Sequence, residues 1–200
     1  MVKFFRTTYS HDHDFRTFSL AYFLRYPNPF ATHVISVDTL SRHVDAEGRL
    51  HTQRLVVKRG KLPRWCRMIL ASSNINISES MVLETTIIDL QKQEIEAVTK
   101  NIDFTKIMRV VESAVYKGVT TDENKQIVVA STEVSFLSQF GFESLKERME
   151  LWGQRKFGEN LNRSRMGMGF VMDKLREQGG KIKLFNLAMQ QALNSSVYKV

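Results

Sequence analysis

The chain has 200 residues, of which 42% are hydrophobic and 25% charged, a composition typical of one globular domain and not of a disordered protein. It holds one cysteine, Cys66, which excludes an intramolecular disulfide and a cysteine-based zinc site, and it lacks the ~18 consecutive apolar residues that a transmembrane helix requires. Its 29 lysines and arginines outnumber 21 aspartates and glutamates, and this net charge of +8 favours an anionic partner: nucleic acid, an anionic membrane surface or an acidic ligand.

The first part of the chain is predicted to form a strand, a helix and a β-hairpin. Residues 4–9 combine aromatic and β-branched side chains, which favours a strand. Apolar side chains then recur at helical spacing over 15–25, with Asp12 or Asp14 placed to cap the helix and prolines placed to end it. From 32 to 59 the apolar period changes to two around a turn signal, which predicts a hairpin.

The middle of the chain continues mainly as β-type segments with short polar connections. A short helix is expected at 64–70, with Pro63 near its first turn, and a polar loop at 72–80. Further strands are predicted at 81–89, 94–104, 107–117 and 127–137. Short links between successive strands indicate an antiparallel meander, which has about seven strands when the amino-terminal one is counted.

Helical spacing returns at Phe142 and predicts a helix of ~30 residues that ends at Gly179-Gly180. We therefore expect an α+β fold: a curved antiparallel sheet of about seven strands, an early inserted helix, a lid loop or short helix, and a long carboxy-terminal helix. The apolar face of the long helix is expected to cover the concave face of the sheet and leave a pocket. The domain is expected to span residues 1–176, with 177–200 as a tail that is either helical or disordered.

The sequence carries few signals of catalysis. It has no glycine-rich phosphate loop, no Gly-x-Ser-x-Gly and no His-Glu-x-x-His. His11 and His13 flank an aspartate, but two histidines alone are weak grounds for a metal, and helix capping explains these polar residues as well. Glu84, Glu112 and Glu133 fall inside strands, where carboxylates are usually solvated or ion-paired. We expect no enzyme, no metal site and no cofactor.

Several basic residues occupy unusual positions. Arg25 ends an apolar helix, Lys58 and Lys61 bracket the end of the hairpin, and Lys156 and Arg163 fall on the apolar stripe of the long helix. Cations on a buried stripe need an anion, solvent, or a path along which the side chain reaches water. Because the basic residues are otherwise dispersed and no nucleic-acid-binding motif occurs, nucleic acid is the weaker interpretation of the charge.

The segment around Trp65 has two interpretations. Tryptophan favours the membrane interface, with its ring in the apolar layer and its N–H toward water. Arg64 and Arg67 could meet lipid phosphates there, while Met68 and Ile69 add apolar surface. The alternative is that Trp65 packs into the protein core.

Several motifs, in a consistent order, carry a family resemblance. They include Arg25-Tyr26-Pro27-Asn28-Pro29, Val37-Asp38-Thr39-Leu40-Ser41-Arg42, Gly60-Lys61-Leu62-Pro63-Arg64-Trp65, Thr99-Lys100-Asn101-Ile102-Asp103, and the run from Lys156-Phe157 to Ser164-Arg165-Met166-Gly167-Met168. Together they closely resemble the PRELI-like (Ups-type) family of mitochondrial intermembrane-space lipid transfer proteins. The last run looks most like the fungal phosphatidic acid transfer branch of that family.

The resemblance implies a carrier that moves phosphatidic acid between the outer and inner mitochondrial membranes and so feeds cardiolipin synthesis. A sister branch moves phosphatidylserine instead. The resemblance also implies a heterodimer with a small helical partner that carries twin cysteine motifs, peripheral contact with anionic mitochondrial membranes, and residence in the intermembrane space on the inner membrane. The pocket between the sheet and the long helix is then a lipid pocket.

Matching positions give an expected site. Arg25 resembles the head-group cation at the pocket floor, His33 and Lys58 resemble its neighbours, and Lys156 and Arg163 match basic positions near the mouth. The expected lid and membrane contact consists of Lys61, Leu62, Arg64, Trp65, Met68 and Ile69. Residues 72–80 depart from the family pattern, so the resemblance does not define the far hinge of the lid.

Overall fold

A computed structural model describes residues 2–60, 63–70 and 79–177. The elements in chain order are β1 (Lys3–His11), α1 (Phe15–Leu24), β2 (Val34–Val44), β3 (Leu50–Arg59), α2 (Arg64–Leu70), β4 (Glu79–Asp89), β5 (Glu94–Asn101), β6 (Arg109–Thr120), β7 (Gln126–Leu137) and α3 (Glu143–Glu177). This content confirms the predicted α+β fold. In the described part of the chain, no helix is both long enough and apolar enough to cross a bilayer.

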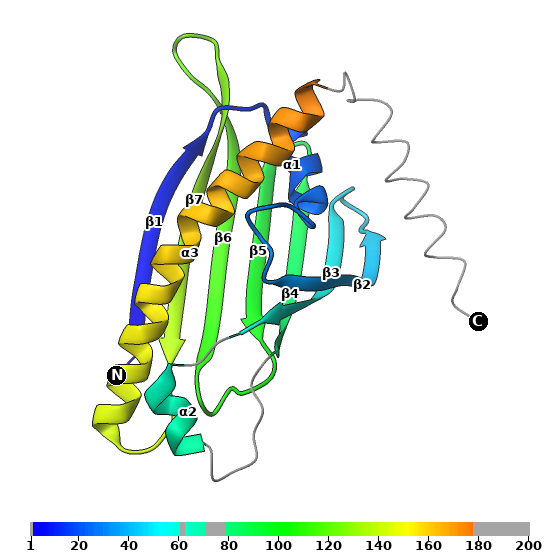
Figure 1. Ribbon diagram of the computed structural model, residues 1–200. Helices are drawn as coiled ribbons and strands as arrows, with labels where there is room; N and C mark the ends of the chain where they lie inside the picture. Colours follow the sequence, from blue (N-terminus) through cyan, green and yellow to red (C-terminus); the bar gives the residue numbers. More distant parts are fainter. Residues whose placement is uncertain (1, 61–62, 71–78, 178–200) are drawn as a thin grey trace, which may run out of the picture.

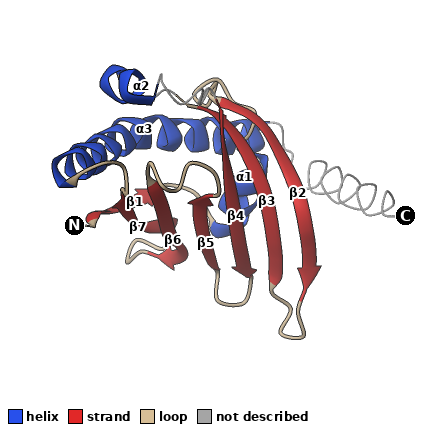
Figure 2. Ribbon diagram, turned by 90° about the horizontal axis from the view of Figure 1, so that it is seen from below, coloured by secondary structure: helices blue, strands red, loops and turns tan. Residues whose placement is uncertain are grey.

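The strands form one antiparallel sheet in the order β1-β7-β6-β5-β4-β3-β2. Strands β2 to β7 follow one another as the predicted meander, and β1 closes the far edge by pairing with β7. Figure 1 shows α3 running obliquely across the sheet, with α1 near its carboxy-terminal half. Figure 2 shows α1 and α3 on the same side of the curved sheet, so this side holds the core.

Helix α1 begins where Asp14 caps it. The Asp14 carboxylate accepts a hydrogen bond from the Thr17 backbone N–H at 2.9 Å, which satisfies one of the unpaired donors of the first turn. Of the two predicted caps, Asp14 is therefore correct, and Asp12 instead pairs with Lys125. The buried face of α1 packs with the inner sheet face and the last turns of α3 in one apolar cluster, which includes Phe15, Phe18, Tyr22, Ile95, Val128, Met168 and Met172.

The segment between α1 and β2 is held in shape by Asn28. A cis peptide joins Tyr26 to Pro27. The Asn28 side chain then donates a hydrogen bond to the Arg25 carbonyl and accepts one from the Phe30 backbone N–H. Helix α3 passes directly over this turn, because a Cβ atom at Gly167 would lie 2.9 Å from the Asn28 amide. The close approach fixes the distance between α3 and the residues that follow α1.

Several strand boundaries differ by one to three residues from the predicted ones, and two of these differences have a clear cause. Strand β5 ends at Asn101 rather than at residue 104, because the Asn101 side chain bonds the backbone of Asp103, Met108 and Val110 and so holds the turn into β6. Strand β4 begins at Glu79, within the predicted loop, since Ser80 pairs with Lys58 of β3. The rest of that loop and the tail from residue 178 lie outside the described residues, as do Lys61 and Leu62.

Candidate functional site

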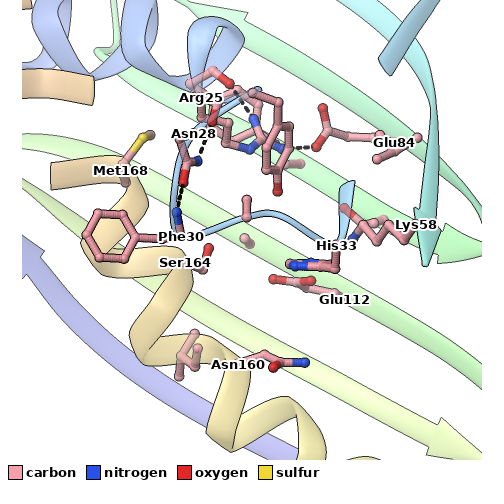
Figure 3. A pocket seen from close by; sticks show the side chains of 18 of the residues that line it. Arg25, Asn28, Phe30, His33, Lys58, Glu84, Glu112, Asn160, Ser164 and Met168 are labelled. Carbon is pink, nitrogen blue, oxygen red and sulfur yellow. Dashed lines mark hydrogen bonds and ion pairs between the residues drawn. The ribbon is translucent and has the colours of Figure 1, made fainter. Parts of the chain in front are cut away.

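A cavity of about 340 Å³ lies between the inner face of the sheet and α3. Its walls come from the end of α1, the segment before β2, strands β3 to β6, and α3 (Figure 3). The apolar part of the lining includes Phe30, Val56, Phe157, Leu161 and Met168. Polar and apolar groups share the lining about equally. A concave site in which polar groups converge beside apolar side chains is a usual place for a small-molecule ligand.

Four polar side chains form one row across the inner face of the sheet. The register places Arg54 of β3 opposite Glu84 of β4, and Glu84 opposite Thr99 of β5. Thr99 in turn lies opposite Glu112 of β6. Opposed residues on antiparallel strands point to the same face, with Cα atoms about 4.5–5.5 Å apart. The four side chains therefore lie side by side on one face, one from each of the strands β3 to β6.

Glu84 holds two arginines at one end of this row. Its carboxylate accepts hydrogen bonds from Arg54 Nε at 2.8 Å and from the Arg25 guanidinium, which also bonds the Tyr22 carbonyl. Burial opposes ionisation of Glu84, but Arg25 and Arg54 outweigh it, and the pKa of the carboxyl is lowered. Two guanidinium groups and one carboxylate leave this triad with one net positive charge.

Arg25 and Glu84 of the triad both line the cavity, and Arg25 is the more exposed of the two. Its side chain keeps 15% of its surface exposed, against 4% for Arg54 and 3% for Glu84. The guanidinium carbon lies 3.9 Å from the centre of the Tyr22 ring, which fixes its orientation by a cation–π contact. Figure 3 shows the Arg25–Glu84 contact at one side of the cavity and Asn160 and Ser164 of α3 on the wall across from it.

Besides Arg25, the basic residues of the lining are His33, Lys58 and Arg59. Within the described residues, no hydrogen bond or ion pair holds the Lys58 ammonium, which faces the cavity from β3. The His33 carbonyl accepts a hydrogen bond from the Arg59 backbone N–H, which ties the start of β2 to the end of β3. Burial, Lys58 and Arg163 together lower the pKa of His33, so its ring is uncharged at neutral pH.

A profile of the PRELI-like family matches residues 17–178 of this sequence. The chain belongs to the PRELI-like family. It is 40% identical over 177 residues to Protein UPS1, mitochondrial, of Saccharomyces cerevisiae, a match that covers 88% of this chain and 97% of that one. It is 41% identical over 156 residues to the ups1 homolog of Schizosaccharomyces pombe, covering 78% and 86% of the two chains. Protein UPS2, mitochondrial, of Saccharomyces cerevisiae is 27% identical over 181 residues, covering 90% and 76%.

Solved structures with low sequence identity share the fold of this PRELI-like chain. The Zhui aromatase/cyclase from Streptomyces gives a TM-score of 0.54 at 8% identity, covering 88% of this chain and 96% of its own. A protein from Thermus thermophilus gives a TM-score of 0.52 at 12% identity, covering 85% and 97%. These neighbours show the fold alone. PRELI-like proteins are lipid transfer proteins, so family membership places the chain outside the enzymes.

The structure brings together three of the basic residues expected in a PRELI-like pocket and separates two. Arg25, His33 and Lys58 line the same cavity. Lys156 and Arg163 were expected on the buried stripe of the long helix, and this placement is wrong because both are exposed. Lys156 pairs with Glu159 at 2.7 Å. The charge of Arg163 still acts on His33, which places it at the rim of the site.

Helix α2 presents only part of the expected lid surface. Arg64 and Met68 are exposed, and Met68 keeps 77% of its surface free. Trp65 is partly buried against the cluster of Cys66, Ile107 and Met149, with the Arg148 guanidinium carbon 4.6 Å from its ring centre. The side chain of Ile69 lies outside the described residues. In this conformation the indole therefore packs on the protein, which agrees with the second interpretation of Trp65, packing into the core.

The sequence-based predictions missed the acidic and amide groups of the site and the buried Arg54. Arg54, Glu84, Glu112, Asn28 and Asn160 all lie at or beside the cavity, and none was assigned to it. A usable signal was present in β3, since Arg54 shares the two-residue period of Lys58 and must face the same side of the sheet. The pairing of Arg54 with Glu84 depends on strand register, which a single strand pattern does not reveal.

Proposed function

We propose that this protein carries phosphatidic acid between the outer and inner mitochondrial membranes and thereby supports cardiolipin synthesis. Its relative at 40% identity is named mitochondrial, and PRELI-like proteins are lipid transfer proteins. The observation that carries the proposal is a cavity that presents Arg25 and Lys58 on one side and apolar side chains of the sheet and α3 elsewhere in its lining. A phosphate monoester with ~1.5 to 2 negative charges suits such a site, since charged donors give short, strong hydrogen bonds to phosphate.

The head group is assigned to the basic side of the cavity. Arg25 and Lys58 contact the phosphate, and His33 donates or accepts a hydrogen bond beside them in its uncharged form. Lys156 and Arg163 lie outside the lining and act at the rim, where they attract an anionic lipid before it enters. The acyl chains lie along the apolar side chains of the sheet and α3, away from water.

Loading requires that the cavity widen. At about 340 Å³ it lies at the small end of sites for drug-sized molecules, and a phospholipid with two long acyl chains is larger. The lid assigned to Lys61, Leu62, Arg64, Trp65, Met68 and Ile69 moves away from the amino-terminal end of α3 and meets the membrane. Trp65 leaves its contacts with Arg148 and the Cys66 cluster in that step, and its ring enters the membrane interface.

The proposal includes a protein partner and a location. The carrier forms a heterodimer with a small helical protein that bears twin cysteine motifs, and it works in the intermembrane space as a peripheral protein on anionic membranes. These assignments rest on the family resemblance of the sequence. The net charge of +8 supports the membrane part, because cationic surfaces bind anionic lipid headgroups.

Mass spectrometry of the lipid that co-purifies with the protein, followed by transfer assays between liposomes, tests the proposal. We expect phosphatidic acid to be enriched over its share in the host membranes, and labelled phosphatidic acid to move from donor to acceptor liposomes. Enrichment of phosphatidylserine instead would assign the chain to the sister activity. A protein that neither retains nor transfers a phospholipid would contradict both assignments.

A further inference from the structure

The end of the sheet that carries α2 is built from segments far apart in the sequence. Strand β5 ends there at Asn101, and β6 begins there at Arg109, opposite Leu137 at the end of β7. Figure 1 shows α2, the β5–β6 connection and the start of α3 together at the lower end of the molecule. The cavity reaches toward the same end, because Arg59 and Gly60, where β3 ends, belong to its lining.

Two connections at this end, β5–β6 and β7–α3, are bonded to each other. The Ser138 hydroxyl donates to the Ile107 carbonyl at 2.6 Å, and the Gln139 N–H donates to the Lys106 carbonyl at 3.1 Å. On its other side the β5–β6 connection is held by the Asp103 carboxylate, which accepts two hydrogen bonds from the start of β4. None of these bonds involves α2, so both connections keep their shape when the proposed lid moves.

Each of the two connections exposes an apolar side chain. Phe142, directly before α3, keeps 68% of its surface free, and Ile102, directly after β5, keeps 47%. The Ile102 N–H donates to the Met81 carbonyl, and Met81 is itself 41% exposed. Apolar side chains gathered at one end of a protein form a surface that a membrane or a partner covers.

The charge of this end decides which occupant fits. Lys100, Lys106 and Arg109 are exposed, and within residues 2–60, 63–70 and 79–177 none of them forms an ion pair. The described carboxylates of this end are Glu79, Asp103, Glu143 and Glu147, and they are outnumbered by its cations, which also include Lys3, Arg59, Arg64, Lys146 and Arg148. Lysine is depleted in protein interfaces, whereas cations beside apolar side chains complement anionic head groups over acyl chains.

We propose that the two connections form a fixed docking face for an anionic membrane, consisting of Ile102, Lys106, Arg109 and Phe142. The inference rests on the proposed function, since a lipid carrier must meet a membrane, and it adds a contact outside the lid. Phe142 and Ile102 enter the membrane interface, while Lys106 and Arg109 meet lipid phosphates. Because none of these residues belongs to α2, the protein stays docked while the lid opens and closes over the cavity.

Binding to vesicles tests the docking face without any transfer step. The full chain is sedimented with vesicles of phosphatidylcholine alone or with added phosphatidylglycerol, and the bound fraction gives the affinity. Phosphatidylglycerol is an anionic phosphodiester and not the proposed cargo, so docking is measured apart from extraction of a lipid.

The apolar part of the face is tested with Phe142→Ser. The Phe142 carbonyl accepts the first helical hydrogen bond of α3, from the Lys146 N–H, and serine is a favoured residue at such a position, so the variant keeps the helix. Leu90→Ser is the matched control, because Leu90 is 67% exposed on the turn between β4 and β5, at the opposite end of the sheet.

The charged part is tested with the double variant Lys106→Gln, Arg109→Gln. Its control is Lys92→Gln, Lys125→Gln, which removes the same net charge from turns at the opposite end of the sheet. All four side chains are exposed, so the unfolding midpoints of both proteins should stay close to that of the wild type.

We expect the wild type to bind the anionic vesicles more tightly than the neutral ones. Phe142→Ser should lower the affinity for anionic vesicles by about tenfold, through lost apolar burial. The double variant at Lys106 and Arg109 should lower it by about fivefold for each residue and remove most of the preference for anionic vesicles. Both controls should bind like the wild type.

Two outcomes overturn the inference. Wild-type binding by Phe142→Ser would leave the exposed apolar side chains to a protein partner. Equal losses in the two double variants would show that net charge governs binding rather than this face, and this comparison decides even if Phe142→Ser does not fold. A wild type that docks through this face but transfers no phosphatidic acid would contradict the proposed function and leave the docking face supported.

Discussion

Glu84 sets the charge that Arg25 presents to the cavity. A guanidinium without a partner would be costly to bury beside Tyr22, and Glu84 offsets that cost for Arg25 and Arg54 at once. The arrangement also holds Arg25 in one position, since its donors reach both Glu84 and the Tyr22 carbonyl. A fixed cation binds an incoming phosphate without a further loss of side-chain entropy.

Replacing Glu84 with Gln should therefore destabilise the fold. The variant leaves two buried guanidinium groups without a counter-charge, and we expect a loss of about 3–5 kcal/mol in the free energy of unfolding. Urea denaturation at neutral pH measures this loss, and Glu133→Gln, whose pair with Arg6 is largely exposed, should cost little. An unchanged free energy for Glu84→Gln would show that the triad does not stabilise the protein.

The same residue predicts a pH dependence with a definite sign. Because the pKa of Glu84 is lowered in the folded state, its contribution is complete above the unperturbed value near 4.5 and is lost as the pH falls through the folded pKa. The difference in stability between the wild type and Glu84→Gln should shrink in that acidic range. A difference that stays constant on acidification would contradict the ionised state of Glu84.

Lys58 is a cleaner test of head-group binding than Arg25. Charge reversal at Arg25 would place a second carboxylate against Glu84, so that variant should lose stability as well as transfer. Lys58→Gln removes one positive charge from the lining, and we expect phosphatidic acid transfer to fall about tenfold, as for one charge-assisted hydrogen bond. Its unfolding midpoint should stay close to that of the wild type. Lys92→Gln, on an exposed turn, is the control and should transfer normally.

At the scale of elements, the position of α3 over the sheet is fixed where Gly167 meets Asn28. The Asn28 amide cannot move away easily, since it bonds both the Arg25 carbonyl and the Phe30 N–H. A methyl group at residue 167 would therefore push α3 away from the turn that carries Arg25. This contact couples the wall of the cavity to its basic side.

Gly167→Ala should cost about 1–3 kcal/mol, the usual range for overpacking a buried contact. Gly169→Ala is the matched control two residues along the same helix, because a Cβ atom there meets nothing within 4 Å. Alanine favours the helix over glycine, so that control should stabilise the protein by about 0.5–1 kcal/mol. The thermal unfolding midpoints of the two variants should shift in opposite directions from that of the wild type. Equal shifts would mean that the Asn28 side chain moves aside for the added methyl group.

The order of elements could be predicted from the sequence because each has its own period and end signals. The two-residue period of β3 and the helical spacing after residue 142 correspond directly to the observed elements. The turn at Asn101 could not be found in this way, since its side chain bonds backbone groups up to nine residues away. Lys156 was placed on the wrong face because more than one series of three- and four-residue spacings can be drawn through the same helix. Only the packing of α3 against the sheet shows which series is buried.

The site was less predictable than the fold for a related reason. Arg25, His33 and Lys58 were assigned through family motifs, and they do line one cavity. From the sequence, Glu84 and Glu112 were both expected to be solvated or ion-paired strand residues. In the structure, Glu84 pairs with two arginines and Glu112 pairs with none. The difference arises from what lies on neighbouring strands and on the segment after α1, which only the assembled sheet brings together.

At the scale of the whole molecule, the net charge of +8 divides into two parts. Arg25 and Lys58 place part of this charge at the cavity, and the remainder lies elsewhere on the protein. Charges at the surface are screened by salt, while those inside a cavity are screened much less. Changing the salt concentration therefore distinguishes attraction of the protein to the membrane from retention of the lipid in the cavity.

Transfer between anionic liposomes should depend strongly on ionic strength, while lipid retention should not. Raising the salt from about 0.1 M to about 1 M shortens the Debye length from about 10 Å to about 3 Å. Each basic residue near an anionic membrane contributes about 1 kcal/mol, so we expect transfer to slow by at least tenfold. Fluorescence transfer assays measure the rate, and gel filtration of pre-loaded protein in both buffers measures retention. If retained lipid falls in step with the rate, the cations of the cavity are open to solvent ions, and Arg25 and Lys58 do not hold the head group inside a closed site.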